Sequence, residues 1–101
     1  MRLNERDHHT KLLDQLKLHA TKWRNIGTYL EFQQGELDII ESKPMLLVQG
    51  PLGYLNEMLS EWYQWAPGDG RGSKDFATLE ALTNAMRQAG LGRAANDLNL
   101  K

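Results

Sequence analysis

The feature that most constrains this chain is the recurrence of large apolar residues at helical spacing. Leu55, Met58, Leu59 and Trp62 fall at positions i, i+3, i+4 and i+7, which lie on one face of an α-helix. Five further segments carry similar stripes, and the alternation typical of strands is almost absent. Helices this short are unstable alone in water, so they must bury their stripes against one another. The sequence therefore predicts an all-α fold in which six helices share one core.

Glycine, proline and capping residues set the expected ends of these helices. Thr21 is a candidate N-cap, and Gly35 and Gly90 are candidate stops, because glycine readily adopts the left-handed conformation after a helix. Pro51 fits the first turn of the fourth helix, where its missing N–H is harmless. The predicted helices span about 10–19, 21 to the stop at Gly35, 36–41, 51 to between 65 and 67, 76–89, and 91–98.

Two connections stand out between these helices. Residues 43–53 hold two prolines, two glycines and the apolar run Met45-Leu46-Leu47-Val48. We expect this run to fold against the bundle as loop or partial turn, with a short strand as the alternative. Residues 68–74 are rich in glycine and predict a flexible polar loop.

Length and charge exclude several classes of protein. The chain has 101 residues, a formal net charge of -1 and no cysteine, so it fits one domain without disulfides, thiolate nucleophiles or thiolate metal sites. No apolar run reaches the roughly 20 residues that cross a bilayer, and the polar start is unlike a signal peptide. We expect a flexible N-terminal segment over 1–9 and the domain over 10–99.

The pattern resembles the death domain family from about residue 10 to 98. The resemblance rests on the tryptophan of the second helix in Trp23-Arg24-Asn25-Ile26-Gly27-Thr28-Tyr29-Leu30, and on the Leu-x-x-Trp that ends at Trp62. It also rests on the Ala77-Thr78-Leu79 entry to the fifth helix. The apolar loop before the fourth helix and the glycine-rich loop after it depart from the family pattern.

The resemblance implies a six-helix antiparallel Greek-key bundle, the death fold, that binds other death domains. It implies a cytoplasmic module of apoptotic, inflammatory or NF-κB-type signalling, within a receptor tail, an adaptor or a larger intracellular protein. It further implies asymmetric pairing, of the chain with itself or with another death domain, into helical oligomers. Neither a cofactor nor nucleic acid nor membrane contact by the domain itself is expected.

The residues that could carry catalysis or bind a metal favour ordinary structural roles. His8 and His9 are adjacent and lack further ligands, so we interpret them as part of a solvated terminus. The serines lack a nucleophile motif, and Glu57 and Glu61 are expected on a solvated helix face. Trp23 and Trp62 are expected in the core. The sequence predicts no enzyme and no metal site.

Charged side chains of opposite sign are the candidate partner-binding residues, because opposite patches on one domain allow head-to-tail association and give it specificity. Two alternatives stay open: another helical module, such as a CARD, a SAM-like domain or a small nucleic-acid-binding bundle, and a small enzyme or ligand carrier. The candidate residues are Lys22, Arg24, Glu36, Asp38, Glu41, Glu57, Glu61, Arg71, Lys74, Arg87 and Arg93.

Overall fold

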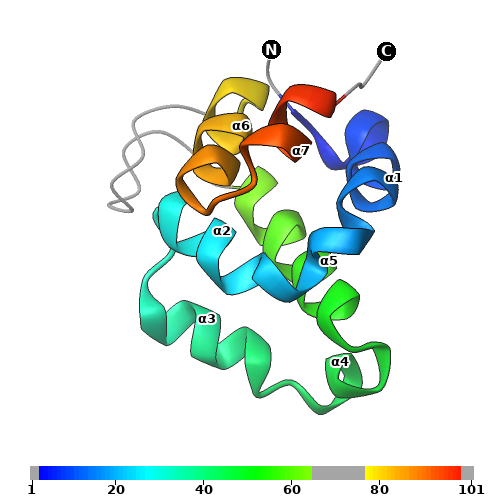
Figure 1. The fold of residues 1–101 in the computed structure, drawn as a ribbon. Coiled ribbons are helices and arrows are strands. Elements are labelled where there is room, and N and C mark those ends of the chain that lie inside the picture. The colour runs from blue at the N-terminus through cyan, green and yellow to red at the C-terminus, as the bar shows by residue number, and fades with distance from the viewer. Residues whose placement is uncertain (1–2, 65–76, 99–101) are drawn as a thin grey trace.

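The computed structural model describes residues 3–64 and 77–98, and these residues form an all-α bundle without strands (Figure 1). The predicted fold class is confirmed. The predicted helices correspond to α1, α2, α3, α5, α6 and α7, and the 3-10 helix η1 and the short α4 are additional. The elements are α1 (Glu5–Leu16), η1 (Lys17–Lys22), α2 (Trp23–Tyr29), α3 (Gln34–Glu41), α4 (Pro44–Gln49), α5 (Pro51–Tyr63), α6 (Leu79–Gln88) and α7 (Gly92–Asp97).

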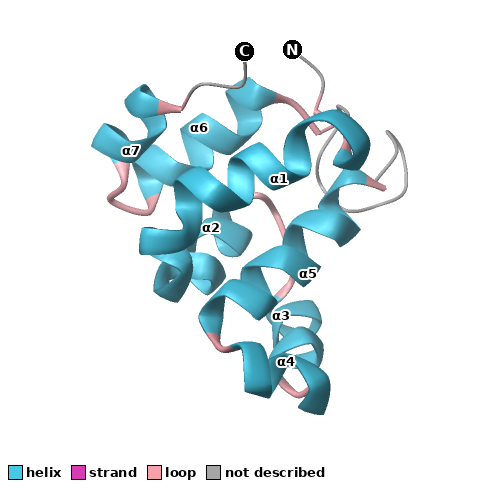
Figure 2. Cartoon of the chain, turned by 90° about the vertical axis from the view of Figure 1, so that its right-hand side faces the viewer, coloured by secondary structure: helices cyan, strands magenta, loops and turns pink. Residues whose placement is uncertain are grey.

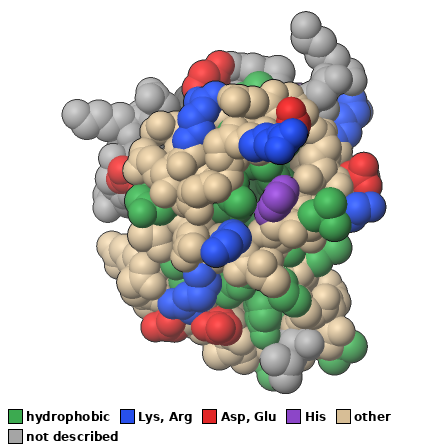
Figure 3. Space-filling view, in the orientation of Figure 1, with side chains coloured by type: hydrophobic (Ala, Val, Ile, Leu, Met, Phe, Trp, Pro, Cys, Tyr) green, Lys and Arg blue, Asp and Glu red, His purple; other side chains and the backbone are tan. Residues whose placement is uncertain are grey.

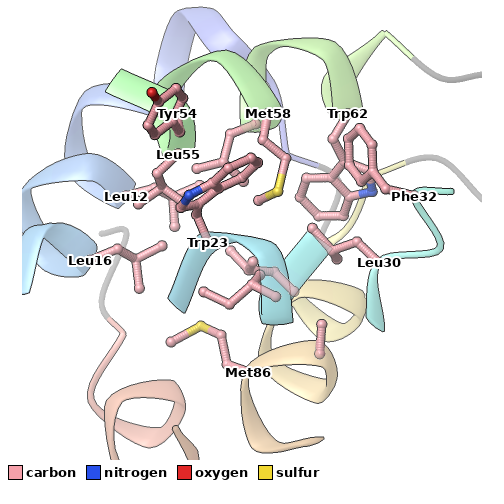
Figure 4. Packing of buried hydrophobic residues seen from close by; sticks show 14 of the residues in the cluster. Leu12, Leu16, Trp23, Leu30, Phe32, Tyr54, Leu55, Met58, Trp62 and Met86 are labelled. Carbon is pink, nitrogen blue, oxygen red and sulfur yellow. The ribbon is translucent and has the colours of Figure 1, made fainter. Parts of the chain in front are cut away.

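The core is built from the apolar stripes that the sequence predicts. Trp23 stacks on Tyr54 with ring centroids 5.2 Å apart, and Trp62 lies beside Phe32 at the other end of the same layer (Figure 4). Both tryptophans are buried, as predicted. Stacked aromatic rings contribute about 0.5–1.5 kcal/mol beyond the area that they bury. The central helix is α5, which packs against α1, α2, α3 and α4.

The first helix begins earlier than the apolar pattern predicts. Asn4 is its N-cap, with the side-chain oxygen 2.7 Å from the backbone N–H of Asp7 that donates to it. Leu3 lies just before the helix and is buried in the core. The structure thus differs from the expected flexible segment before residue 10, because a capped turn extends the helix over polar residues that carry no apolar stripe.

The stops and starts around α2 are also corrected. Thr21 lies inside η1 and caps nothing, and Gly35 lies inside α3 instead of ending a helix. The chain leaves α2 at Glu31, whose φ of 80° is in the left-handed region. The backbone N–H groups of Phe32 and Glu31 donate to the carbonyls of Gly27 and Thr28, which is the Schellman motif. Buried Phe32 holds this turn, so a glutamate takes the place that usually favours glycine.

The apolar run after α3 forms a helix, so both the loop and the strand expected there are wrong. Pro44 occupies the first turn of α4, and Leu46 reaches the core. The backbone N–H of Gly50, at a φ of 72°, closes the helix on the carbonyl of Leu46. Pro51 begins α5 as predicted. Figure 2 shows α3 and α4 at one narrow end of the molecule, away from α6 and α7.

The helices near the C-terminus follow the prediction with shifted ends. The last residue of α5 is Tyr63, slightly before the expected end, and the expected loop over 68–74 lies outside the described residues. Thr78 caps α6 by accepting from the backbone N–H of Ala81, so this helix starts later than expected. Gly90 ends α6 with a φ of 87°, as predicted, and α7 follows directly.

Candidate functional site

A charged cluster joins α2 to α3, and its centre is the guanidinium group of Arg24. Its Nη1 donates to Oε2 of Glu41 at 2.5 Å, and its Nη2 donates to Oδ1 of Asp38 at 2.7 Å. The same Nη2 lies 3.2 Å from Oε1 of Gln34. The first turn of α2 therefore contacts α3 near its start, its middle and its end. We call Arg24, Gln34, Asp38 and Glu41 the α2–α3 cluster.

The local sequence explains why these side chains meet. Asp38 and Glu41 are three residues apart and therefore lie on the same side of α3. The side chain of Glu36 accepts from the backbone N–H of Gln33 at 3.0 Å, which fixes the first turn of that helix. On the inner face, Leu37 is buried close to Gly27 of α2. The two helices are thus held together from both sides.

The α2–α3 cluster is acidic as a whole, because two carboxylates face one guanidinium. The hydrogen bond with Asp38, together with the negative charge of Glu41, raises the pKa of Arg24 despite some desolvation. The Arg24 side chain is 29% exposed, whereas those of Asp38 and Glu41 are 67% and 53% exposed. Exposed ion pairs contribute only about 0–1 kcal/mol each, so the main effect of Arg24 is to hold two outward carboxylates in place.

This arrangement changes the expected grouping of charges. Lys22, Arg24, Asp38 and Glu41 were each expected to contact a partner, as charges of opposite sign. The guanidinium is instead committed to those acids, and Lys22 is left exposed at the end of η1. Side-chain pairing across two helices depends on how they cross, which the sequence does not state.

The basic candidates lie on η1 and α6, which pack against α2, and on α7, which packs against α6. Arg87, in the last turn of α6, donates to Oδ1 of Asn96 on α7 at 3.2 Å, and Arg93 is exposed on α7. Helix α6 packs against both α2 and α7. Figure 3 shows lysine and arginine side chains on this face of the molecule, with acidic side chains beside several of them. We call Lys22, Arg87 and Arg93 the basic face.

The two glutamates of α5 do not form the solvated face that was expected. Glu57 and Glu61 are both half-buried, and Oε1 of Glu57 accepts from Nζ of Lys43 at 2.7 Å. This hydrogen bond raises the pKa of Lys43, and the charge of Glu61 adds to the effect. The pair ties the residue before α4 to α5. Sequence reasoning missed Lys43, because nothing in the chain indicated that α4 folds back along α5.

His9 was also expected to be solvated, and the structure corrects this. Its ring is half-buried between two groups of α5, with Nε2 2.5 Å from Oδ1 of Asn56 and Nδ1 3.1 Å from Oη of Tyr63. In the tautomer with the proton on Nε2, that nitrogen donates to Asn56 and Nδ1 accepts from Tyr63. The histidine therefore fastens α1 to α5. A hydrogen-bonded structural role explains its position.

Three further expectations concern the loop after α5, metal ligands and membrane-spanning helices. Arg71 and Lys74 lie outside the described residues. Over 3–64 and 77–98, no three potential ligand side chains gather as a metal site would require. Within those ranges no helix has the length and apolar character to cross a membrane.

Comparison with known protein families decides what this bundle is. The family model described as "Death domain" matches residues 6–101. The chain belongs to the death domain family. Its fold is accordingly the death fold, the six-helix antiparallel Greek-key bundle that the family resemblance implies. No curated protein and no solved structure matches the chain.

Membership settles the coarse function. Death domains are protein–protein interaction modules of signalling, not enzymes, and they typically bind other death-fold domains. The match favours this family over the CARD and SAM-like alternatives. The α2–α3 cluster and the basic face are therefore candidate interaction surfaces of a death domain. Its short α4 lies where the sequence departs from the family pattern.

Proposed function

We propose that this death domain acts in the cytoplasm in apoptotic, inflammatory or NF-κB-type signalling, where it binds another death domain through its charged surfaces. The observation that supports this most is the α2–α3 cluster. Asp38 and Glu41 are fixed by Arg24 yet remain largely exposed. A partner cation can reach these carboxylates without first ordering them, which lowers the entropy cost of binding.

The basic face supplies a complement on the same molecule. Lys22 and Arg93 are exposed, and they lie on η1 and α7, whereas the acidic cluster joins α2 to α3. The acidic α2–α3 cluster of one copy can therefore bind the basic face of the next copy. Such pairing is head-to-tail and stays open-ended unless its geometry closes a ring. We infer that assembly into short helical oligomers uses these two surfaces, with Glu36, Glu57, Glu61, Arg71, Lys74 and Arg87 as further candidate contacts.

The balance of charge fits a protein partner better than nucleic acid. The formal net charge of the whole chain is -1. Arg24, a basic residue of α2, is paired with the acids Asp38 and Glu41 and does not add to a basic stripe. Nucleic-acid binding needs a basic stripe that contacts many phosphates. Charges of both signs instead steer encounter and select among protein partners.

The test compares two aspartates of similar exposure. Asp38→Lys reverses a charge of the α2–α3 cluster, and Asp14→Lys reverses one on α1, where Asp14 is 74% exposed and lies 3.4 Å from Lys17. Each variant is titrated against purified death domains, including a second copy of this chain, at low and high salt. We expect Asp38→Lys to weaken binding by about tenfold or more, which is about 1.4 kcal/mol, while Asp14→Lys has little effect.

Three controls keep the result interpretable. Circular dichroism must show equal helicity in both variants, and a helical protein outside the death-fold superfamily must not bind. Higher salt must weaken the wild-type complex, because exposed charges are screened. Absence of binding to every death domain, or an equal loss with both variants, would contradict the proposal.

A further inference from the structure

A ring of uncharged hydrogen-bonding groups lies beside the ion pairs of the α2–α3 cluster. The hydroxyl of Thr28, near the end of α2, donates to the carbonyl oxygen of Arg24 at 2.9 Å. Gln34 is the first residue of α3, and its Nε2 donates to Oγ1 of Thr28 at 3.1 Å. Oε1 of Gln34 accepts from Nη2 of Arg24 at 3.2 Å. The hydrogen bonds therefore lead from the guanidinium of Arg24 back to the carbonyl of the same residue.

The donors and acceptors of this ring fit in one direction only. A guanidinium has no acceptor, so the amide group of Gln34 that faces Arg24 must be its oxygen. The hydrogen of the Thr28 hydroxyl is used on the carbonyl of Arg24, so Oγ1 accepts from the amide nitrogen of Gln34. A glutamate at position 34 would offer Thr28 no donor, and an apolar side chain would offer neither group. The amide of Gln34 therefore satisfies both of its neighbours on α2 at once.

The ring holds Arg24 across the turn between the two helices. Figure 1 shows that a short connection turns the chain back from α2 into α3. Thr28 precedes this turn and Gln34 follows it. The guanidinium carbon of Arg24 also lies 5.7 Å from the ring centroid of buried Trp23, within the range of a cation–π contact. Uncharged contacts thus hold the guanidinium in addition to its two carboxylates.

This restraint matters because arginine has much rotamer freedom to lose. The Arg24 side chain is 29% exposed, so burial alone does not fix it. Asp38 and Glu41 are both bonded to its guanidinium, so a movement of that group releases both carboxylates. Side chains that are ordered only on binding reduce affinity, whereas side chains ordered in advance do not. Thr28 and Gln34 carry no charge, so they affect this order without changing the electric field that steers a partner.

We propose that Thr28 and Gln34 are positioning residues of the partner-binding surface. Their hydrogen bonds fix Arg24, and Arg24 in turn fixes the two carboxylates for a cation of the partner. This inference rests on the proposed function, because it concerns the charged surface through which the domain is proposed to bind another death domain. The charges of that surface set the rate of association, and the uncharged ring sets the rate of dissociation.

Nuclear magnetic resonance of the isotope-labelled free chain tests the positioning step without a partner. Thr28→Val removes the hydroxyl at similar size, whereas Thr28→Ser retains it. The matched control is Thr83→Val in α6, where the hydroxyl of Thr83 donates to the carbonyl of Glu80 at 3.1 Å, away from this ring. We expect the Nε–Hε group of Arg24 to be more mobile in Thr28→Val than in the wild-type chain, Thr28→Ser and Thr83→Val. Equal mobility in all four chains would overturn the proposal.

Binding kinetics test the consequence of this order. The probes are the purified death domains of the binding test above, including an immobilised second copy of this chain. We expect Thr28→Val and Gln34→Met to raise the dissociation rate by about threefold to tenfold and to leave the association rate unchanged. Thr28→Ser and Thr83→Val should match the wild-type chain. Thr28→Val combined with Gln34→Met should add little to either change alone, because both residues act through one ring.

The outcomes separate this proposal from the proposed function. If Asp38→Lys weakens binding but Thr28→Val and Gln34→Met leave the dissociation rate unchanged, the charged surface stands and the positioning role is refuted. A slower association of Thr28→Val, or an equal effect of Thr83→Val, would also refute it. If the wild-type chain binds none of the death domains, the proposed function fails and the positioning role fails with it, whatever the mobility of Arg24.

Discussion

The contact between α4 and α5 offers the sharpest prediction, because two glycines in similar helical positions meet opposite surroundings. Gly53 lies in the first turn of α5, and Gly35 lies in the first turn of α3. A Cβ on Gly53 would lie 2.7 Å from Cβ of Gln49 and 3.3 Å from the carbonyl oxygen of Leu46. A Cβ on Gly35 would meet no atom within 4 Å. The same substitution therefore tests packing at one site and helix propensity at the other.

The magnitudes predict opposite signs for the two alanine variants. Favourable carbon contacts lie at about 3.5–4.0 Å, so the new methyl group of Gly53→Ala overlaps Gln49 by roughly 1 Å. It would also lie 3.1 Å from Oε1 of Gln49, which can rotate away, but Cβ of Gln49 and the carbonyl oxygen of Leu46 are fixed by the backbone of α4. Overpacking costs about 1–3 kcal/mol, and better helix propensity returns at most about 1 kcal/mol. We expect Gly53→Ala to lower the free energy of unfolding by about 1–2 kcal/mol and Gly35→Ala to raise it by up to about 1 kcal/mol.

Urea denaturation followed by circular dichroism measures both changes, and thermal melts give a second reading. For a domain of this size a change of about 1 kcal/mol shifts Tm by about 4–8 °C. Gly53→Ala should melt clearly below the wild-type chain, and Gly35→Ala at or above it. Equal shifts in the same direction would mean that α4 does not pack on α5 as described.

Two further predictions concern the core and the ion pair beside α4. Trp62→Ala should lower the free energy of unfolding by about 3–5 kcal/mol, because the indole is buried. Val48→Ala on the exposed surface should change it by less than about 0.5 kcal/mol. A mild effect of Trp62→Ala in urea denaturation would contradict the inward face of α5. Hydrogen bonding to Glu57 raises the pKa of Lys43 above its ordinary value of 10.5, so the stability from this pair is complete below that pH and is lost as the pH rises through the raised pKa. Denaturation at a series of alkaline pH values should therefore show a steeper loss for the wild-type chain than for Glu57→Gln, and parallel curves would show that the pair does not form.

The sequence predicts the helices whose apolar stripes repeat over two turns or more. The stripes that include Trp23, Ile26, Leu55 and Trp62 all face the core, since burial of these faces is what makes the helices stable. Gly90 ends α6 as predicted, because its left-handed conformation costs glycine little. These features depend on residues near one another in the chain.

The features that the sequence misses depend on distant contacts. Helix α4 has apolar residues on all sides and so lacks a helical stripe, and its direction is decided by where Leu46 finds the core. Glu31 takes a conformation typical of glycine because Phe32 is buried beyond it. The ion pair of Lys43 with Glu57 joins residues 14 apart in the chain, and only the packing of α4 on α5 brings them together.

Chemical-shift mapping tests the central claim of a charged death-domain interface most directly. Isotope-labelled chain is titrated with a death domain that binds it, and the backbone amides of α2 and α3 are followed by nuclear magnetic resonance. We expect the largest shifts around Arg24, Asp38 and Glu41, and we expect Asp38→Lys to remove them while the amides of α1 are unchanged. Shifts confined to other helices, with α2 and α3 undisturbed at saturation, would contradict the account.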